Sequence, residues 1–196
     1  MLLIVRHAAP AIVAAAPPDQ WELGESGRAV AAAMCATLPR GAVLVSSGEP
    51  KARQTIEAAG PVSTDARFNE VRRAGEPFDD GFFARRKAYV SGVDHDGWEP
   101  RTEVAARFAE GVDHWLARAA GRPLVIASHG MALTLWLTSA IGLPAPSEFW
   151  ADLRLPDRLR VDLDGRAVSR WEPPDDLPVE TPLMDPRISP TRRRSR

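Results

Sequence analysis

The sequence is poor in cysteine, lysine and tyrosine, and it has no long hydrophobic run. Its single cysteine, Cys35, excludes an intrachain disulfide scaffold and suits a reducing compartment. No stretch approaches the roughly 20 apolar residues that a membrane span needs. The apolar start, residues 2–5, lacks a preceding positive segment and is interrupted by Arg6-His7, so it does not match a secretion signal. We therefore expect a cytoplasmic protein.

The chain of 196 residues also has little excess charge of either sign, with a formal net charge of −1. It is 44% hydrophobic and 26% charged, a composition typical of one soluble globular domain. Such a chain has no long-range field to attract a nucleic-acid backbone or an anionic membrane, so we expect neither partner and favour a small ligand. The oligomeric state is left open. Of the 25 lysines and arginines, only Lys51 and Lys87 are lysines.

Apolar and amphipathic segments alternate along the chain. Short apolar runs without polar alternation predict buried parallel strands over 2–5, 42–45 and 124–127. Helical patterns lie between and after them, over 26–38, 51–59, 102–119 and 133–141. This order predicts an α/β fold, a three-layer α/β/α sandwich whose central sheet is mostly parallel and carries helices on both faces.

The remaining segments are less regular. Residues 66–100 contain several glycine and proline breaks, and we expect loops and short helices there that shape a pocket. Asp164-Gly165 separates two strand-like runs and predicts an antiparallel edge hairpin. Beyond it, prolines recur at every fourth position from Pro174 to Pro190. We expect one folded domain over 1–172 and a Pro- and Arg-rich extended or disordered tail over 173–196.

Polar groups follow all three predicted parallel strands. The first strand ends at Arg6-His7, the second at Ser46-Ser47 and the third at Ser128-His129-Gly130. Ligands of open α/β sheets bind outside the carboxyl ends of the strands, so these groups should share one crevice. If the first and third strands are neighbours, a spacing of about 4.8 Å brings both imidazoles to one small site.

Five segments, in this order, resemble the histidine phosphatase superfamily, also called phosphoglycerate mutase-like. They are Leu3-Ile4-Val5-Arg6-His7, residues 21–28, Ser46-Ser47 with residues 51–55, Phe68-Asn69-Glu70-Val71, and Ser128-His129-Gly130. The resemblance covers residues 1–142. It implies a catalytic domain that forms a phosphohistidine on His7, with Glu70 as the proton donor. Arg6, Lys51 and His129 would then hold the phosphoryl group of a small phosphorylated substrate, and neither a metal nor a cofactor is expected.

The implied roles suit the residue types. Arg6 can grip two phosphoryl oxygens with its planar fork, and His129 can donate a hydrogen bond. Gly130 permits close backbone approach at the start of a helix, where anions bind favourably. His7 must be neutral to attack, and nearby cations favour that form. Bound phosphate would raise the pKa of Glu70 and keep its acid form until the leaving group departs.

The chain departs from the family pattern at four positions. Ala8 stands where a glycine is usual, and Lys51 stands where an arginine is usual, so the cation there lacks a bidentate fork. Pro10 and Val13 stand where mutase-like members often place a hydroxyl and an asparagine.

We therefore favour a phosphomonoester hydrolase. A phosphoglycerate mutase-like transferase is the first alternative, and a non-catalytic module that binds a phosphorylated ligand is the second. Arg72 and Arg73 are expected to be solvated loop charges.

Overall fold

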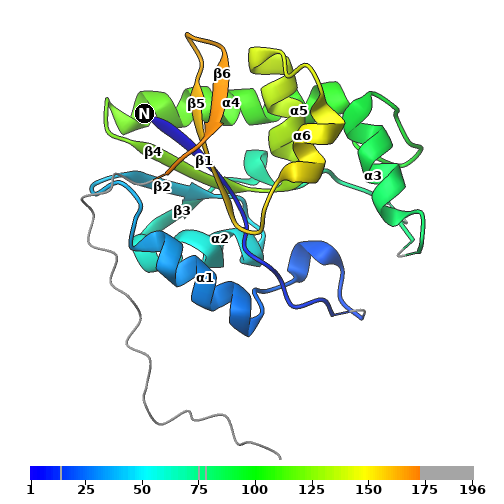
Figure 1. Cartoon of the computed structure of the whole chain (residues 1–196), viewed down its shortest axis with the longest axis horizontal. Helices are drawn as coiled ribbons and strands as arrows, with labels where there is room; N and C mark the ends of the chain where they lie inside the picture. Colours follow the sequence, from blue (N-terminus) through cyan, green and yellow to red (C-terminus); the bar gives the residue numbers. More distant parts are fainter. Residues whose placement is uncertain (14, 75, 78, 173–196) are drawn as a thin grey trace, which may run out of the picture.

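The protein is described by a computed structural model that covers residues 1–172 except 14, 75 and 78. Its strands are β1 Leu2–Arg6, β2 Val43–Ser46, β3 Val62–Thr64, β4 Leu124–Ser128, β5 Asp157–Asp162 and β6 Ala167–Arg170. They form one sheet in the order β3-β2-β4-β1-β5-β6 (Figure 1). The first four strands are parallel, whereas β5 pairs antiparallel with both β1 and β6. The predicted sheet and its antiparallel edge are confirmed.

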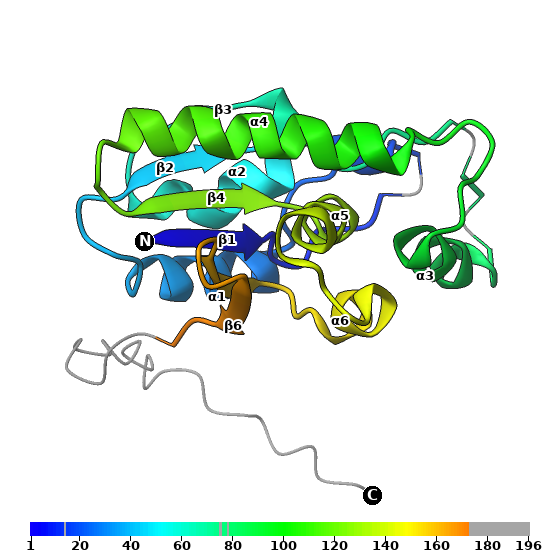
Figure 2. The same ribbon diagram turned by 90° about the horizontal axis from the view of Figure 1, so that it is seen from above.

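Helices cover both faces of this sheet (Figure 2). They are α1 Glu25–Cys35, α2 Pro50–Ile56, α3 Phe82–Ser91, α4 Arg101–Ala119, α5 Gly130–Ile141 and α6 Pro146–Asp152. Helices α1 and α2 pack with the apolar side chains of one sheet face, and α4 and α5 pack against the other. No helix in the described part of the chain is both long and apolar enough to cross a membrane. The three-layer prediction is confirmed.

Some element boundaries differ from the sequence prediction. Helix α5 begins at Gly130, directly after β4, rather than at residue 133. Helix α2 ends at Ile56 and continues as a 3-10 turn over 57–59, because the chain tightens before Gly60-Pro61. The short strand β3 and the helix α6 were not predicted. The tail over 173–196 lies outside the described residues, so its expected conformation stays a prediction.

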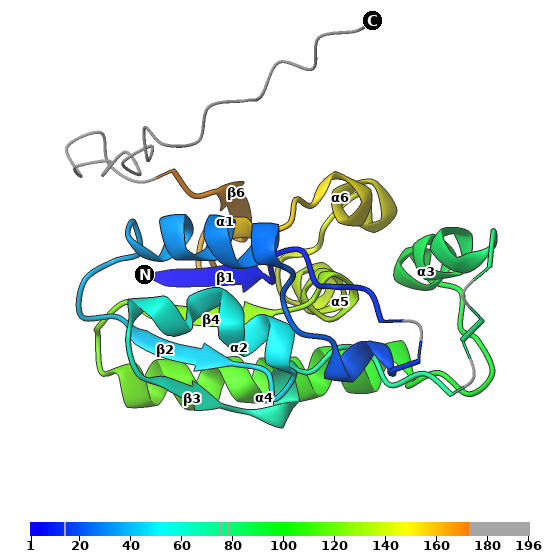
Figure 3. The same ribbon diagram turned by 90° about the horizontal axis from the view of Figure 1, so that it is seen from below.

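The sheet core explains why the strand ends are fixed in place. The β1 side chains Leu3, Ile4 and Val5 have no exposed surface, and every residue of β4 is buried. In the β1–β4 pairing, Arg6 lies opposite Ser128, so the first and third predicted strands are neighbours, which is the condition for bringing the two imidazoles together. The chain after β1 and helix α3 both lie beyond the carboxyl ends of the parallel strands (Figure 3). The carboxyl ends of the parallel strands therefore face two surface segments, the loop after β1 and helix α3.

Candidate active site

The two histidines at the strand ends lie side by side. The imidazole centroids of His7 and His129 are 5.2 Å apart. His7 continues β1 and donates its backbone N–H to Ser128 O at 3.1 Å, which holds the two strand ends together. Ala8 N, next along the chain, donates to Thr55 Oγ1 at 2.9 Å and ties the same segment to α2. The structure thus brings both predicted imidazoles to one site.

His7 has the protonation state that a nucleophile needs. Its Nδ1 lies 2.8 Å from Ala8 O, to which it can donate, so the neutral ring carries its lone pair on Nε2. Burial, together with the positive charges of Lys51 and Arg6, lowers the pKa of His7 to about 3. Nearby cations contribute as the sequence predicts, but burial is the larger cause.

His129 is fully buried beneath His7 and has one unpartnered nitrogen. Its Nε2 lies 2.7 Å from Ser47 Oγ and 3.4 Å from Glu49 Oε1, whereas Nδ1 has no hydrogen-bond partner. When the Ser47 hydroxyl donates to Nε2, the ring proton resides on Nδ1 and can be donated to a ligand. Burial and the charge of Lys51 hold the pKa of His129 well below its ordinary value, so the ring is neutral here.

One nitrogen of the Arg6 guanidinium is hydrogen-bonded, and another has no partner. Its Nη1 donates to Leu153 O at 2.7 Å, while its buried Nε has no partner. The first residue of α5, Gly130, lies against this guanidinium. A Cβ at that position would sit 3.0 Å from Trp150 Nε1 and 3.3 Å from Arg6 Nε, so glycine leaves the space that a larger residue would fill.

Lys51 is buried and paired with a carboxylate. It lies in the first turn of α2, where its Nζ donates to Pro18 O at 2.7 Å and forms an ion pair with Glu49 Oε2. Burial raises the pKa of Glu49, although Lys51 opposes that shift. Arg53 pairs instead with Glu57 at the surface, so it does not replace Lys51 in the site.

The carboxylate of Glu70 lies against the first turn of α5. Its Oε1 accepts hydrogen bonds from Val71 N at 3.1 Å and Ala132 N at 2.9 Å, and its Oε2 accepts one from Met131 N at 3.3 Å. Burial acts to raise the pKa of Glu70, but the positive charge of Arg73 and the backbone donors outweigh it, so the pKa is lowered. Glu70 is therefore a carboxylate here.

These groups surround a single cavity of about 550 Å³. The predicted site residues that line it are Arg6, His7, Lys51, Glu70 and Gly130. His129 does not line it, because its ring is fully buried behind the others.

The walls of the cavity extend beyond the strand ends. They include residues of the loop after β1, residues 69–73, helix α3 and Leu155. Pro10 lines the cavity, but Val13 is not among its lining residues. The irregular region 66–100 thus contributes to the pocket, as the sequence predicts.

A sequence model of the histidine phosphatase superfamily (branch 1) matches residues 2–165. The chain belongs to this superfamily. No curated protein sequence matches it significantly.

Several solved structures share this histidine phosphatase fold. A mycobacterial glucosyl-3-phosphoglycerate phosphatase, in complex with inorganic phosphate, is 21% identical, with 87% of this chain and 95% of that chain covered and a TM-score of 0.65. Bacillus stearothermophilus YhfR is 19% identical, with 86% and 94% covered and a TM-score of 0.66. An Entamoeba histolytica phosphoserine phosphatase mutant, in complex with phosphoserine, is 13% identical, with 87% and 94% covered and a TM-score of 0.61.

The structure adds one residue that the sequence analysis did not single out. Glu49 is buried, and its carboxylate pairs with Lys51, lies beside His129 and accepts Glu70 N–H at 2.7 Å. It therefore contacts three of the predicted site residues of this histidine phosphatase superfamily member. The available signal was a carboxylate two positions before a rare lysine, just after a buried strand.

A second cluster corrects an expectation about the loop charges. The Arg73 side chain is only 10% exposed and donates to Glu76 Oε2 at 2.9 Å, so it is not solvated. Arg86 of α3 donates to the two oxygens of the same carboxylate, at 2.9 and 2.8 Å. Arg72 is largely exposed, as expected, and pairs with Glu99 at 3.1 Å. Burial of Glu76 requires these cations, which explains why Arg73 turns inward.

Proposed function

We propose that this protein is a phosphomonoester hydrolase that forms a covalent phosphohistidine on His7. One observation carries the proposal. Arg6 Nε and His129 Nδ1 are two of the three buried side-chain polar atoms without a partner in the described residues; Arg6 lines the same cavity as His7, and the His129 ring lies 5.2 Å from the His7 ring. Buried polar atoms in proteins are nearly always hydrogen-bonded, so an unpartnered donor of Arg6 on the cavity wall and a second one of His129 behind that wall favour a ligand rich in acceptor oxygens. A phosphoryl group is such a ligand.

In the first step, the lone pair on His7 Nε2 attacks phosphorus. The N–P bond forms while the bond from phosphorus to the ester oxygen breaks. Arg6, Lys51 and His129 stabilise the charge that spreads over the three equatorial oxygens. The departing oxygen takes a proton from Glu70, whose pKa rises when a substrate dianion binds beside it. The alcohol then leaves as a neutral molecule.

In the second step, water attacks phosphorus from the side that the alcohol has left. Glu70, now a carboxylate, accepts a proton from this water, and its backbone hydrogen bonds suit the ionised form. The O–P bond forms and the N–P bond breaks, which regenerates neutral His7 and releases inorganic phosphate. The substrate is a small phosphorylated metabolite, in keeping with the size of the cavity.

Hydrolysis of an aryl phosphate by the wild type and by His7→Ala tests the proposal. Wild-type turnover with none above background in the variant is expected, whereas equal rates refute it. Glu70→Gln should still form the phosphoenzyme from an aryl phosphate, whose leaving group needs little proton assistance, and should hydrolyse it slowly. An alkaline quench and intact-mass measurement detect that intermediate. With a phosphorylated sugar acid, formation of an isomer without free phosphate would favour the mutase alternative.

A further inference from the structure

The mouth of the cavity carries exposed hydrophobic side chains, which phosphate binding does not require. In the described residues, seven large hydrophobic side chains are exposed, and three of them line this one cavity. They are Ile12 (64% exposed), Phe83 (69%) and Leu155 (43%). Scattered exposed apolar residues are ordinary, but their concentration at the mouth of a ligand pocket marks a binding surface.

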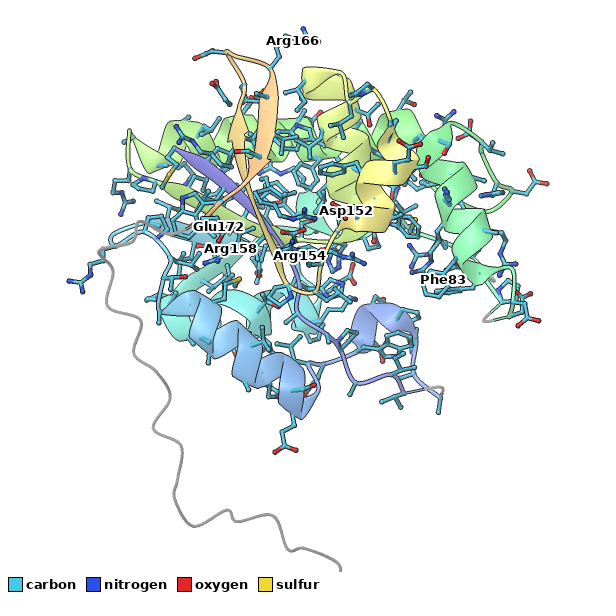
Figure 4. All side chains as sticks on the ribbon, viewed as in Figure 1. Phe83, Asp152, Arg154, Arg158, Arg166 and Glu172 are labelled. Atoms are coloured by element: carbon cyan, nitrogen blue, oxygen red, sulfur yellow. The ribbon has the colours of Figure 1, made fainter. Side chains whose placement is uncertain are left out.

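These three residues come from separate parts of the chain. Ile12 lies in the loop after β1, Phe83 lies in the first turn of α3, and Leu155 follows α6. Figure 4 shows Phe83 at the start of α3, on the side of the molecule where the loop after β1 also lies. The Phe82 ring, 5.4 Å from that of Phe83, and Trp21 extend the apolar wall. These apolar side chains thus lie on more than one wall of the cavity that Arg6 and His7 also line.

The cationic side chains on the same walls are already paired. Arg73 and Arg86 both bind Glu76, whose side chain is only 6% exposed, and Arg72 binds Glu99. Moreover, the exposed carboxylate of Asp19 lines the mouth. A second anionic group on the substrate would meet paired guanidiniums and one exposed carboxylate. Because Arg73 and Arg86 share one carboxylate, they keep a net positive charge, so a preference for an apolar group rests on the exposed hydrophobic side chains.

We infer that the mouth is a subsite for an apolar leaving group, so that the substrates are phosphate monoesters of hydrophobic alcohols or phenols. This inference rests on the proposed function, because the ester oxygen must point from His7 toward the mouth. Burial of the leaving group removes the exposed surfaces of both partners from water. Substrate discrimination would then depend on hydrophobic contact at Ile12, Phe83 and Leu155.

A homologous series of ethyl, butyl and hexyl phosphate tests this subsite, with glycerol phosphate as the polar member. The three alkanols have similar acidity, so differences in rate among their esters report contacts with the chain. We expect kcat/KM of the wild type to rise roughly two- to fourfold per added methylene until the mouth is filled. Hexyl phosphate should also exceed glycerol phosphate by at least about tenfold. A flat series, or a preference for glycerol phosphate, overturns the inference.

Phe83→Ala supplies the local test, with Val93→Ala as its matched control. Val93 is 52% exposed but does not line the cavity. Phe83→Ala should lower kcat/KM for hexyl phosphate about fivefold to tenfold relative to ethyl phosphate, while Val93→Ala leaves that ratio unchanged. An unchanged ratio in Phe83→Ala contradicts the inference. Because Phe83 is largely exposed, its truncation should leave the thermal unfolding temperature close to that of the wild type.

Binding without turnover separates this inference from the proposed function. Calorimetry on His7→Ala measures the Kd of each alkyl phosphate directly. A Kd that falls with chain length in a protein whose wild type hydrolyses none of the series supports the subsite and refutes only the hydrolase proposal. A Kd independent of chain length refutes the subsite, whatever the wild type hydrolyses.

Discussion

Replacement of Glu49 by glutamine should tighten the binding of inorganic phosphate. Glu49 is a buried carboxylate that pairs with Lys51 and lies 3.4 Å from His129 Nε2. Both partners are proposed phosphate ligands, so the carboxylate competes with a phosphoryl group for the same cation. The Glu49→Gln variant removes this charge and keeps an oxygen that can accept Glu70 N–H. Geometry is retained while electrostatic repulsion is lost.

The size of the effect follows from these contacts. A phosphoryl oxygen held by Lys51 or His129 would lie one further hydrogen bond away, about 5 Å from the Glu49 carboxylate. At an effective dielectric constant of about 20, two unit charges at that distance repel by roughly 3 kcal/mol. Side-chain relaxation, loss of the ion pair and partial protonation of Glu49 reduce this value. We therefore expect a Kd for phosphate that is at least about tenfold lower, equivalent to about 1.4 kcal/mol.

Isothermal titration calorimetry with inorganic phosphate measures the difference. Glu99→Gln is a matched control, because Glu99 is also a buried carboxylate paired with arginines but contacts neither Lys51 nor His129 in the described interactions. Its phosphate Kd should not fall. If Glu49 served only to hold the structure together, Glu49→Gln would bind phosphate more weakly than the wild type. Unchanged or weaker binding would refute the electrostatic argument.

Three further predictions concern the strand-end site and its support. Lys51→Arg should reduce kcat/KM for an aryl phosphate about tenfold or less, and Lys51→Ala should reduce it at least about a hundredfold, because only arginine keeps the cation. Equal losses in this assay would contradict a phosphate-binding role. Between pH 7 and pH 5, the free energy of unfolding should fall by about 2 kcal/mol more in the wild type than in His7→Gln. The reason is that unfolded His7 takes up a proton below its ordinary pKa of 6.5, whereas folded His7 does so only near 3. If urea denaturation gave the same pH-dependent loss for both proteins, His7 would not be buried as a neutral ring. Gly27→Ala should destabilise the fold by about 2–3 kcal/mol, because its Cβ would lie 2.1 Å from Ala9 O, whereas Gly24→Ala meets Ala11 N at an ordinary 3.6 Å and should cost less in the same denaturation experiment.

The sequence predicts those parts of the fold that have a strong local signal. Strands β1, β2 and β4 are runs of apolar residues buried on both faces, and a run of that kind has few other stable placements. In contrast, β3 has only three residues, two of them exposed, so no pattern marks it. Helix α6 has seven residues and one buried side chain, Trp150, which is too little for a helical periodicity to emerge.

The candidate site likewise contains residues that local sequence patterns predict and residues that only tertiary contacts bring together. Arg6, His7 and His129 were expected together because each follows a buried strand, and strand pairing fixes their separation. The pairing of Glu49 with Lys51 and the inward turn of Arg73 depend on which distant segments meet. Local sequence patterns contain no such information. The ionised state of Glu70 is likewise set by tertiary contacts, first with Arg73 and then with backbone amides that include one at the start of α5.

The division of the cavity between the sheet edge and the surface segments has an evolutionary consequence. Three of the groups proposed to act on phosphorus, Arg6, His7 and His129, lie at strand ends whose neighbours are fully buried, so mutations there disturb the whole domain. Ile12 and Phe83, at the mouth, are mostly solvent-exposed, and their replacement leaves the core intact. Related enzymes can therefore diverge in substrate choice through a few surface mutations while the reaction itself is inherited unchanged.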